Sequence, residues 1–272
     1  MKLESASFSV FDVETTGLYP YSGDRICEIG AVRVSAGKKA VKKFHALVDP
    51  ERPISPAASA VNGITDSMVR GKPTVDKVLP AFMDFIRGSV LVAYNAGFDL
   101  GFLECSLGDE KEALNEYYII DALRLARRLF PGIGRYNLGS VAQALGISPE
   151  GEHRALADAV ITWKVFEIEL EALRSEGIRA VEDIGGVSAR AKPSIAAVKD
   201  YKLALIEAAI REQKKLNIVY RSSWNDKVTE RTITPKRIHR GYDRFYVVAQ
   251  CHLKNAERNF RLDCIIKAEE HR

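Results

Sequence analysis

The chain has 272 residues, 46% of them hydrophobic and 28% charged, which is typical of a folded protein with one large or two ordinary domains. No apolar run approaches the ~20 residues that span a bilayer, and the first ten residues lack the apolar segment of a secretory signal. We therefore expect a cytoplasmic protein with no membrane contact. Its four cysteines, none of them in a CxxC pair, are expected to be reduced thiols rather than disulfides or zinc ligands.

The net charge of +4 is unevenly distributed along the chain. Residues 199–272 hold 17 Lys and Arg against 10 Asp and Glu, a charge of +7, which leaves −3 in residues 1–198. An acidic front part suits a metal site, and a basic back part suits a polyanionic partner such as nucleic acid. The alternative is that the basic part is an ordinary charged surface.

The front part of the chain predicts three strands followed by alternating helices and strands. Segments rich in Val, Ile and Phe between glycine-containing turns predict strands at residues 6–14, 26–34, 42–48, 90–94 and 118–121. Apolar residues at helical spacing predict helices at residues 74–87, 98–107, 122–129, 138–145 and 155–173, with short helices between residues 55 and 70. A meander followed by helix and strand in alternation indicates an α/β fold with a mixed sheet flanked by helices.

The back part of the chain predicts a second, smaller domain. Periodicity fades after Arg174 and glycines accumulate, so we expect a first domain at residues 1–174 and a linker at residues 175–194. An amphipathic helix is expected at residues 195–215. Short strands are expected at residues 217–220, 228–235, 244–251 and 259–262. Residues 195–272 are therefore predicted to form a small basic α+β domain.

Four carboxylates and one histidine lie in three separated clusters. They are Asp12 and Glu14 in FDVETTG, Asp99 in NAGFD, and His153 with Asp158 in HRALADA. Asp12 and Glu14 point to the same side of a strand because side chains alternate along it. Two like charges side by side cost energy unless a positive charge lies between them. Divalent cations such as Mg²⁺ prefer carboxylate oxygens, and paired ions clamp the attacking and leaving oxygens of a phosphodiester. The clusters therefore predict metal-assisted phosphodiester hydrolysis.

Residues 5–172 resemble the DEDDh 3′→5′ exonucleases, a family that includes the proofreading subunit of bacterial replicative polymerases, ribonuclease T and oligoribonuclease. The family's motifs DxETTGL, NxxFD and HRAxxDA are matched by residues 12–18, 95–99 and 153–159. The resemblance implies a ribonuclease-H-like fold and two divalent ions, Mg²⁺ or Mn²⁺, held by Asp12, Glu14, Asp99 and Asp158. It also implies that His153 is the general base, a role that suits histidine because its side chain titrates near neutrality.

The same resemblance implies a pocket for the 3′-terminal nucleotide. Its expected contacts are Thr15, Thr16, Gly17, Leu18, Ile64, Asn95 and Phe98. Phe98 either packs on a base or belongs to the core. Asn62 and Tyr94 stand where many relatives carry histidine, a departure that bears on substrate preference. Asp121 is expected to cap a helix N-terminus rather than to join the site.

Residues 200–267 resemble, more loosely, a WYL-type domain. Only the central tyrosine of the signature Trp-Tyr-Leu is present, in Phe245-Tyr246-Val247. Such domains are associated with nucleic-acid or nucleotide-like ligands, and arginine and tyrosine suit these ligands because guanidinium groups pair with phosphate and aromatic faces stack on bases. The expected contacts are Tyr220, Arg231, Tyr246, Arg258 and Arg261. The alternative is a sheet whose aromatic residues form the core and whose arginines are solvated.

Together these patterns predict a two-metal 3′→5′ exonuclease that releases 5′-mononucleotides from single-stranded 3′ ends. DNA is the expected substrate, in proofreading or repair, with a DNA polymerase as a candidate partner. An RNA-directed exonuclease with the same catalytic set is one alternative. A non-catalytic sensor that binds nucleic acid through the basic domain is another, although the complete acidic set argues against it.

Overall fold

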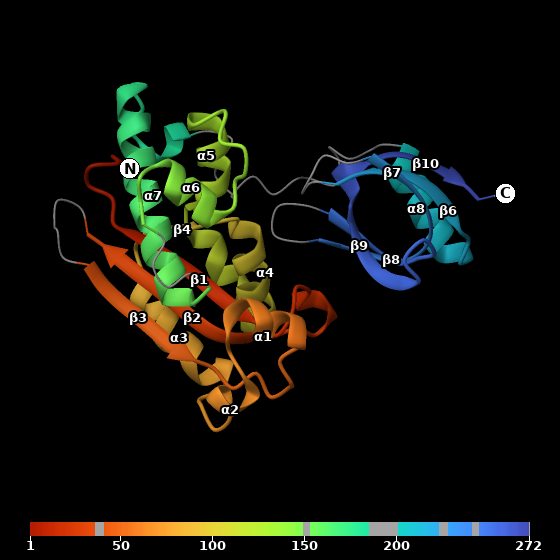
Figure 1. Cartoon of the computed structure of the whole chain (residues 1–272), viewed down its shortest axis with the longest axis horizontal. Coiled ribbons are helices and arrows are strands. Elements are labelled where there is room, and N and C mark those ends of the chain that lie inside the picture. The colour runs from red at the N-terminus through yellow and green to blue at the C-terminus, as the bar shows by residue number, and fades with distance from the viewer. Residues whose placement is uncertain (36–40, 149–152, 185–200, 223–227, 241–244, 272) are drawn as a thin grey trace. The chain divides into compact units, whose positions relative to one another are not determined.

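The computed structural model describes residues 1–35, 41–148, 153–184, 201–222, 228–240 and 245–271. The chain divides into two compact units, Met1–Arg190 and Ala191–Arg272, both drawn in Figure 1. Each unit has its own hydrophobic core. The site predicted from the acidic motifs lies wholly in the first unit.

The first unit is built on a five-stranded mixed sheet. Its strands are β1 (Phe8–Thr15), β2 (Ile26–Val34), β3 (Val41–Leu47), β4 (Val90–Ala93) and β5 (Ile119–Asp121), in the order β3-β2-β1-β4-β5. The first three strands pair antiparallel, whereas β4 and β5 continue the sheet parallel to β1. The predicted meander therefore forms one side of the sheet, and the helix–strand alternation forms the other.

Helices cover both faces of this sheet. They are α1 (Pro56–Asn62), α2 (Asp66–Val69), α3 (Val75–Ile86), α4 (Ala96–Leu107), α5 (Ala122–Leu129), α6 (Leu138–Ala144) and α7 (Ala155–Ser175). On one face Phe8 of β1 meets Phe166 of α7 edge to face, and on the other Phe11 meets Phe82 of α3. These contacts enclose β1 between two helical layers and confirm the predicted α/β fold class. Among the described helices none is long and apolar enough to cross a bilayer.

Helix α7 brings the third motif against the strand that carries the first. It lies across β1 and β2 (Figure 1). Its first turn approaches the sheet at Gly30, which stands opposite Asp12 in the β1–β2 ladder. A Cβ atom at Gly30 would lie 2.1 Å from the backbone nitrogen of Leu156, so only glycine permits this approach. Because side chains alternate along β1, Asp12 shares the α7 face with Phe8.

The segment after α7 packs on the first unit. Val181 and Ile184, in a short 3-10 helix, are buried in the same cluster as Leu3. The sequence pattern assigned these residues to the linker at 175–194, because a contact with the first residues of the chain leaves no local signal. The rest of that linker, residues 185–194, lies outside the described residues. The domain boundaries stay a prediction.

The second unit consists of a five-stranded antiparallel sheet and a helix packed on it. The helix is α8 (Tyr201–Glu212), and the strands are β6 (Leu216–Arg221), β7 (Val228–Arg240), β8 (Phe245–Cys251), β9 (Ala256–Arg261) and β10 (Ile265–Glu270), in the order β10-β6-β7-β8-β9. The α+β prediction is confirmed. It missed β10, where an irregular register between Ile265 and Lys267 interrupts the alternation of buried and exposed residues. Residues 195–200 of the predicted helix and Arg244 lie outside the described residues.

Candidate active site

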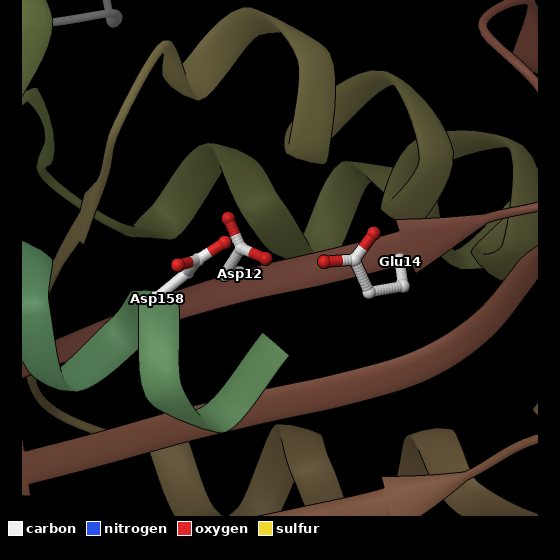
Figure 2. A group of neighbouring side chains, drawn as sticks. All are labelled: Asp12, Glu14 and Asp158. Carbon is white, nitrogen blue, oxygen red and sulfur yellow. The ribbon is translucent and has the colours of Figure 1, made fainter. Parts of the chain in front are cut away.

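Three of the four predicted carboxylates form one cluster. Asp12, Glu14 and Asp158 each offer an oxygen atom, and these atoms all lie within 4.8 Å of one another. Figure 2 shows Asp12 and Glu14 side by side on β1, with Asp158 reaching Asp12 from the first turn of α7. The close approach of α7 to β2 is therefore what joins the first and third motifs.

Asp99 comes to the same place from α4. It is buried in the first turn of that helix, and its Oδ1 accepts a hydrogen bond from the backbone nitrogen of Val13 at 3.1 Å. Val13 lies between Asp12 and Glu14, so this bond fastens α4 to the strand at the carboxylate cluster. Asp99 lies outside the group of oxygens within 4.8 Å, but its charge acts on Asp12 more than that of any other neighbour.

Burial and mutual repulsion raise the pKa of these carboxyl groups. The pKa of Asp12 lies well above its ordinary value, first because of burial and then because of neighbouring carboxylates, Asp99 foremost. Burial, followed by the charges of Asp158 and Glu28, raises the pKa of Glu14 from 4.5 to about 7. Burial also raises the pKa of Asp99. Acids held in this way favour a bound proton or a bound cation, and the all-oxygen donor set fits Mg²⁺ or Mn²⁺.

His153 is placed at the edge of this cluster by its backbone. Its backbone nitrogen donates a hydrogen bond to Oδ2 of Asp158 at 3.1 Å. The residue adopts φ +65°, a left-handed conformation that few residues other than glycine adopt. The residue is exposed, so its ring is open to solvent immediately before the helix that carries Asp158.

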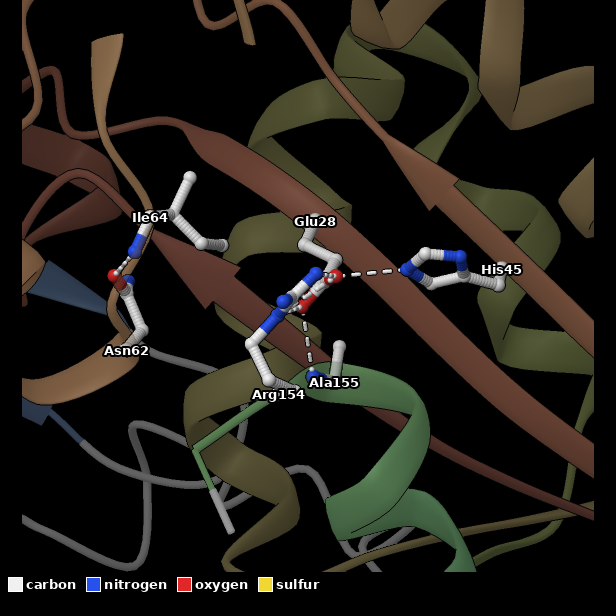
Figure 3. Close-up of polar contacts among 6 residues, drawn as sticks. All are labelled: Glu28, His45, Asn62, Ile64, Arg154 and Ala155. Atoms are coloured by element: carbon white, nitrogen blue, oxygen red, sulfur yellow. Dashed lines mark hydrogen bonds and ion pairs between the residues drawn. The ribbon is translucent and has the colours of Figure 1, made fainter. Parts of the chain in front are cut away.

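A fifth carboxylate, which the sequence analysis did not select, lies beside the cluster. Glu28 of β2 stands opposite Glu14 in the β1–β2 ladder and is fully buried. In Figure 3 it lies between His45 of β3 and Arg154, and it binds both. A signal was present in the sequence: a glutamate interrupts the apolar segment ICEIGAV of a strand, as the acids of the first motif interrupt theirs.

The predicted nucleotide pocket is open at some residues and closed at others. The side chain of Leu18 is 66% exposed, and Asn95 is exposed in a left-handed conformation at the start of α4. Thr15 and Thr16 are buried, and their hydroxyl groups are hydrogen-bonded within the turn, that of Thr15 to the carbonyl of Gly17. Leu18 is therefore the predicted pocket residue with the most exposed apolar side chain.

Ile64, an expected contact of the terminal nucleotide, is a buried residue of the predicted pocket. Its side chain is 0% exposed and packs in a hydrophobic cluster with Cys27 and Ile54. Its backbone nitrogen donates to Oδ1 of Asn62 at 2.9 Å (Figure 3), and Nδ2 of Asn62 donates to the carbonyl of Thr15 at 3.4 Å. Asn62 thus links this segment to the first motif through hydrogen bonds, and the side chain of Ile64 anchors the segment in the core.

Two residues had two expected roles each. Phe98 is half-buried with its ring 5.1 Å from that of Phe102, so it has a core contact and also an open side, and both interpretations stand. Asp121 caps α5, as predicted, by accepting a hydrogen bond from the backbone nitrogen of Arg124. It also accepts one from the backbone nitrogen of Asn95, which ties the second motif to β5.

The candidate contacts of the second unit lie on two faces of its sheet. Tyr246 pairs directly with Arg261 between β8 and β9, so the two side chains share a face. The ring of His239 stacks on that of Tyr246 on the same face. Residues that alternate with Arg261 along β9 point to the opposite face, where Phe260 is buried in the core.

The remaining three candidates belong to the core side. Tyr220 meets the ring of Phe260 edge to face, and the guanidinium carbon of Arg231 lies 5.9 Å from the centroid of that ring. Arg258 pairs with Ala249, a residue of the same buried cluster, and is itself exposed. A single binding surface formed by all five candidates is therefore not supported, because strand alternation separates them.

Comparison with known proteins assigns the chain to a family. Residues 9–166 match the family model described as "Exonuclease", and residues 201–270 match the model of the WYL domain. The chain belongs to the exonuclease family. DNA polymerase III subunit epsilon of Treponema pallidum is 39% identical to it over 165 residues, which cover 60% of this chain and 76% of that protein.

Other relatives are larger or more distant. DNA polymerase III PolC-type of Caldanaerobacter subterraneus subsp. tengcongensis is 36% identical over 213 residues, but the match covers 78% of this chain and only 15% of that protein. A solved structure described as 3′-end specific recognition of histone mRNA stem-loop by 3′-exonuclease has a TM-score of 0.52 and 18% identity, over 61% of this chain and 64% of that chain. That likeness shows the fold alone, which is the predicted ribonuclease-H-like architecture.

Proposed function

We propose that this chain is a metal-dependent 3′→5′ exonuclease that hydrolyses phosphodiesters at single-stranded 3′ ends and releases 5′-mononucleotides. The observation that carries the proposal is the cluster of Asp12, Glu14 and Asp158, whose oxygens converge within 4.8 Å. Burial and the repulsion between neighbouring carboxylates in this cluster favour the binding of a cation. Membership of the exonuclease family gives the reaction class.

Each carboxylate has a place in the proposed metal site. Figure 2 shows Asp12 between Glu14 and Asp158, so Asp12 would be a ligand of both divalent ions. Glu14 and Asp158 would complete one set of ligands, and Asp99 would contribute to the second from α4. Two such ions would offset the charge that develops on the attacking and leaving oxygens of the phosphodiester.

The remaining residues would handle the proton and the substrate. The exposed ring of His153 would accept the proton of the attacking water, a step that typically contributes about 10²–10⁴-fold to the rate. Its backbone bond to Asp158 keeps the base and the carboxylate cluster in a fixed relation. The exposed side chain of Leu18 would pack on the terminal nucleotide, with the backbone around Thr15, Thr16 and Gly17 shaping the turn beneath it.

DNA is the proposed substrate, in proofreading or repair. The support is the relation to DNA polymerase III subunits, which also makes a DNA polymerase a candidate partner and a cytoplasmic location the expected one. The RNA-directed alternative keeps the same catalytic residues and stays open. In the second unit, the face with Tyr246 and Arg261 is the proposed contact for nucleic acid, because an aromatic ring and a guanidinium group lie next to each other there.

A digestion experiment tests the proposal. Single-stranded DNA, single-stranded RNA and a mismatched primer-template, each labelled at the 5′ end, are incubated with the full chain and Mg²⁺ or Mn²⁺, and the product lengths are resolved. Stepwise shortening from the 3′ end, faster on DNA and absent with Asp12→Ala, is the expected result. Cleavage inside the strand, or undiminished digestion by Asp12→Ala, would falsify the proposed function.

A further inference from the structure

Glu28 differs from the other carboxylates on its face of the sheet because the protein itself supplies its positive partners. Its Oε1 accepts from Nη2 of Arg154 at 2.5 Å and lies 2.7 Å from Nε2 of His45. Its Oε2 accepts from the backbone nitrogen of Ala155 at 2.9 Å, and both oxygens lie 3.2 Å from Nε of Arg154. Figure 3 shows this carboxylate enclosed by its partners.

The charge state of Glu28 follows from these contacts. Burial alone would raise its pKa, but the hydrogen bonds from Arg154, His45 and the Ala155 amide outweigh burial and hold the pKa below its ordinary value. Glu14, one strand away, has its pKa raised. Glu28 therefore favours the charged form on which its ion pair with Arg154 depends.

The partners of Glu28 belong to the segment that carries the third motif. Arg154 directly follows His153, and Ala155 is the first residue of α7. The carbonyl of Arg154 accepts the helical hydrogen bond from the backbone nitrogen of Asp158 at 2.9 Å. Asp158 lies less than one helical turn beyond Ala155, so a shift or tilt of the start of α7 would move its carboxylate directly.

The backbone of β2 also meets the start of α7 at Gly30, two residues from Glu28. Gly30 has no side chain, so β2 and the first turn of α7 meet backbone to backbone there, and residue 30 contributes no polar side-chain contact to the helix. Glu28, two residues along β2 and on the same face, grips the helix start through a bidentate ion pair and a backbone bond. Bidentate pairs fix orientation as well as distance.

We propose that Glu28 and Arg154 are positioning residues that lock the start of α7 onto β2, and so set the places of His153 and Asp158 relative to Asp12 and Glu14. This inference rests on the proposed function, since it assigns to the clamp the geometry of that catalytic set. Groups that orient metal ligands from outside the coordination sphere typically affect metal affinity or activity by about 10–100-fold. A comparable effect is expected here.

The test uses the full chain with Glu28→Gln, Arg154→Gln and Arg154→Lys. Glu28→Gln keeps the shape of the side chain but removes its charge and one acceptor, and Arg154→Lys keeps the charge but loses the bidentate geometry. Arg128→Gln is the matched control, because Arg128 forms a 2.7 Å ion pair with Glu176 just beyond the far end of α7. All variants are measured well below their melting temperatures, so that unfolding cannot imitate the effect.

Three readouts separate positioning from stability. With Glu28→Gln and Arg154→Gln, kcat should fall about 10–100-fold and the Mn²⁺ concentration for half-maximal binding, measured by calorimetry without nucleic acid, should rise. The KM for a single-stranded oligonucleotide should change little. Arg154→Lys should recover part of the loss, and Arg128→Gln should match the wild type in all three.

The outcomes that overturn the proposal are distinct from those that overturn the function. Folded Glu28→Gln or Arg154→Gln with wild-type kcat and Mn²⁺ binding would refute the positioning role, and so would a rise in KM alone. If Glu28→Gln does not fold, the comparison of Arg154→Gln with Arg154→Lys decides by itself. Equal Mn²⁺ binding by the wild type and Asp12→Ala would instead refute the metal site on which the function rests.

Discussion

The raised pKa of Glu14 makes a prediction that needs no substrate: without divalent metal, Glu14→Gln should stabilise the first unit at pH 8 and not at pH 4. Burial and the charges of Asp158 and Glu28 raise the pKa of Glu14 from 4.5 to about 7. Below pH 4.5 the folded and unfolded chains both hold the proton, so there is no difference in stability. As the pH rises to 7 the unfolded chain loses the proton first, and the folded state becomes progressively less stable. Above pH 7 the folded state bears the full loss of stability that comes from ionising Glu14.

The magnitude follows from the same shift. At about 1.36 kcal/mol per pKa unit, a rise from 4.5 to about 7 corresponds to an upper bound of about 3.4 kcal/mol. Glu14 is partly accessible to water, and screening reduces this bound to about 1–2 kcal/mol. For a unit of this size that difference raises the melting temperature by about 2–8 °C.

The assay is thermal unfolding between pH 4 and pH 8 in excess chelator. Fluorescence of Trp163 reports on the first unit, because its ring packs against Phe8 and Phe166. The control is Glu171→Gln, a neutralisation at an exposed position of α7. Added Mg²⁺ should stabilise the wild type more than Glu14→Gln and so remove the difference. If Glu14→Gln raised the melting temperature equally at pH 4 and pH 8, or did not raise it at pH 8, the charge of Glu14 would not be a source of the repulsion described above.

Three further outcomes are expected. Asp12→Ala should abolish turnover, and excess chelator should abolish it in the wild type. The melting temperature of Asp12→Ala should equal or exceed that of the wild type, because the substitution relieves repulsion. Digestion that survives either change contradicts the two-metal arrangement. His153→Ala should lower kcat about 10²–10⁴-fold and flatten the acid limb of the pH–rate profile, with Mn²⁺ and DNA affinity nearly unchanged; loss of metal binding would make His153 a ligand instead. Arg261→Glu in the full chain should weaken binding to long single strands and lower the log–log salt slope by about one, whereas an unchanged slope would remove this face from the nucleic-acid contact.

Much of the fold and of the acidic cluster is determined by local sequence. Alternation along residues 6–14 is enough to place Asp12 and Glu14 on one face of a strand, since side-chain direction in a strand has a period of two. Ala122–Leu129 forms α5 with the bounds that its periodicity predicts, and Asp121 caps it as its residue type suggests. These features depend on neighbours within a few residues.

Other features depend on contacts between segments far apart in the chain, and only the tertiary structure decides them. Glu28 gives no sign in the sequence that Arg154 and Ala155 will meet it, because their contact arises when α7 packs at Gly30. The sequence also does not show that the side chain of Ile64 is buried, because that depends on packing against Cys27 and Ile54. The local sequence pattern determines the direction in which a side chain points from its own strand or helix. The residues that this side chain then contacts are determined by the other element that packs there.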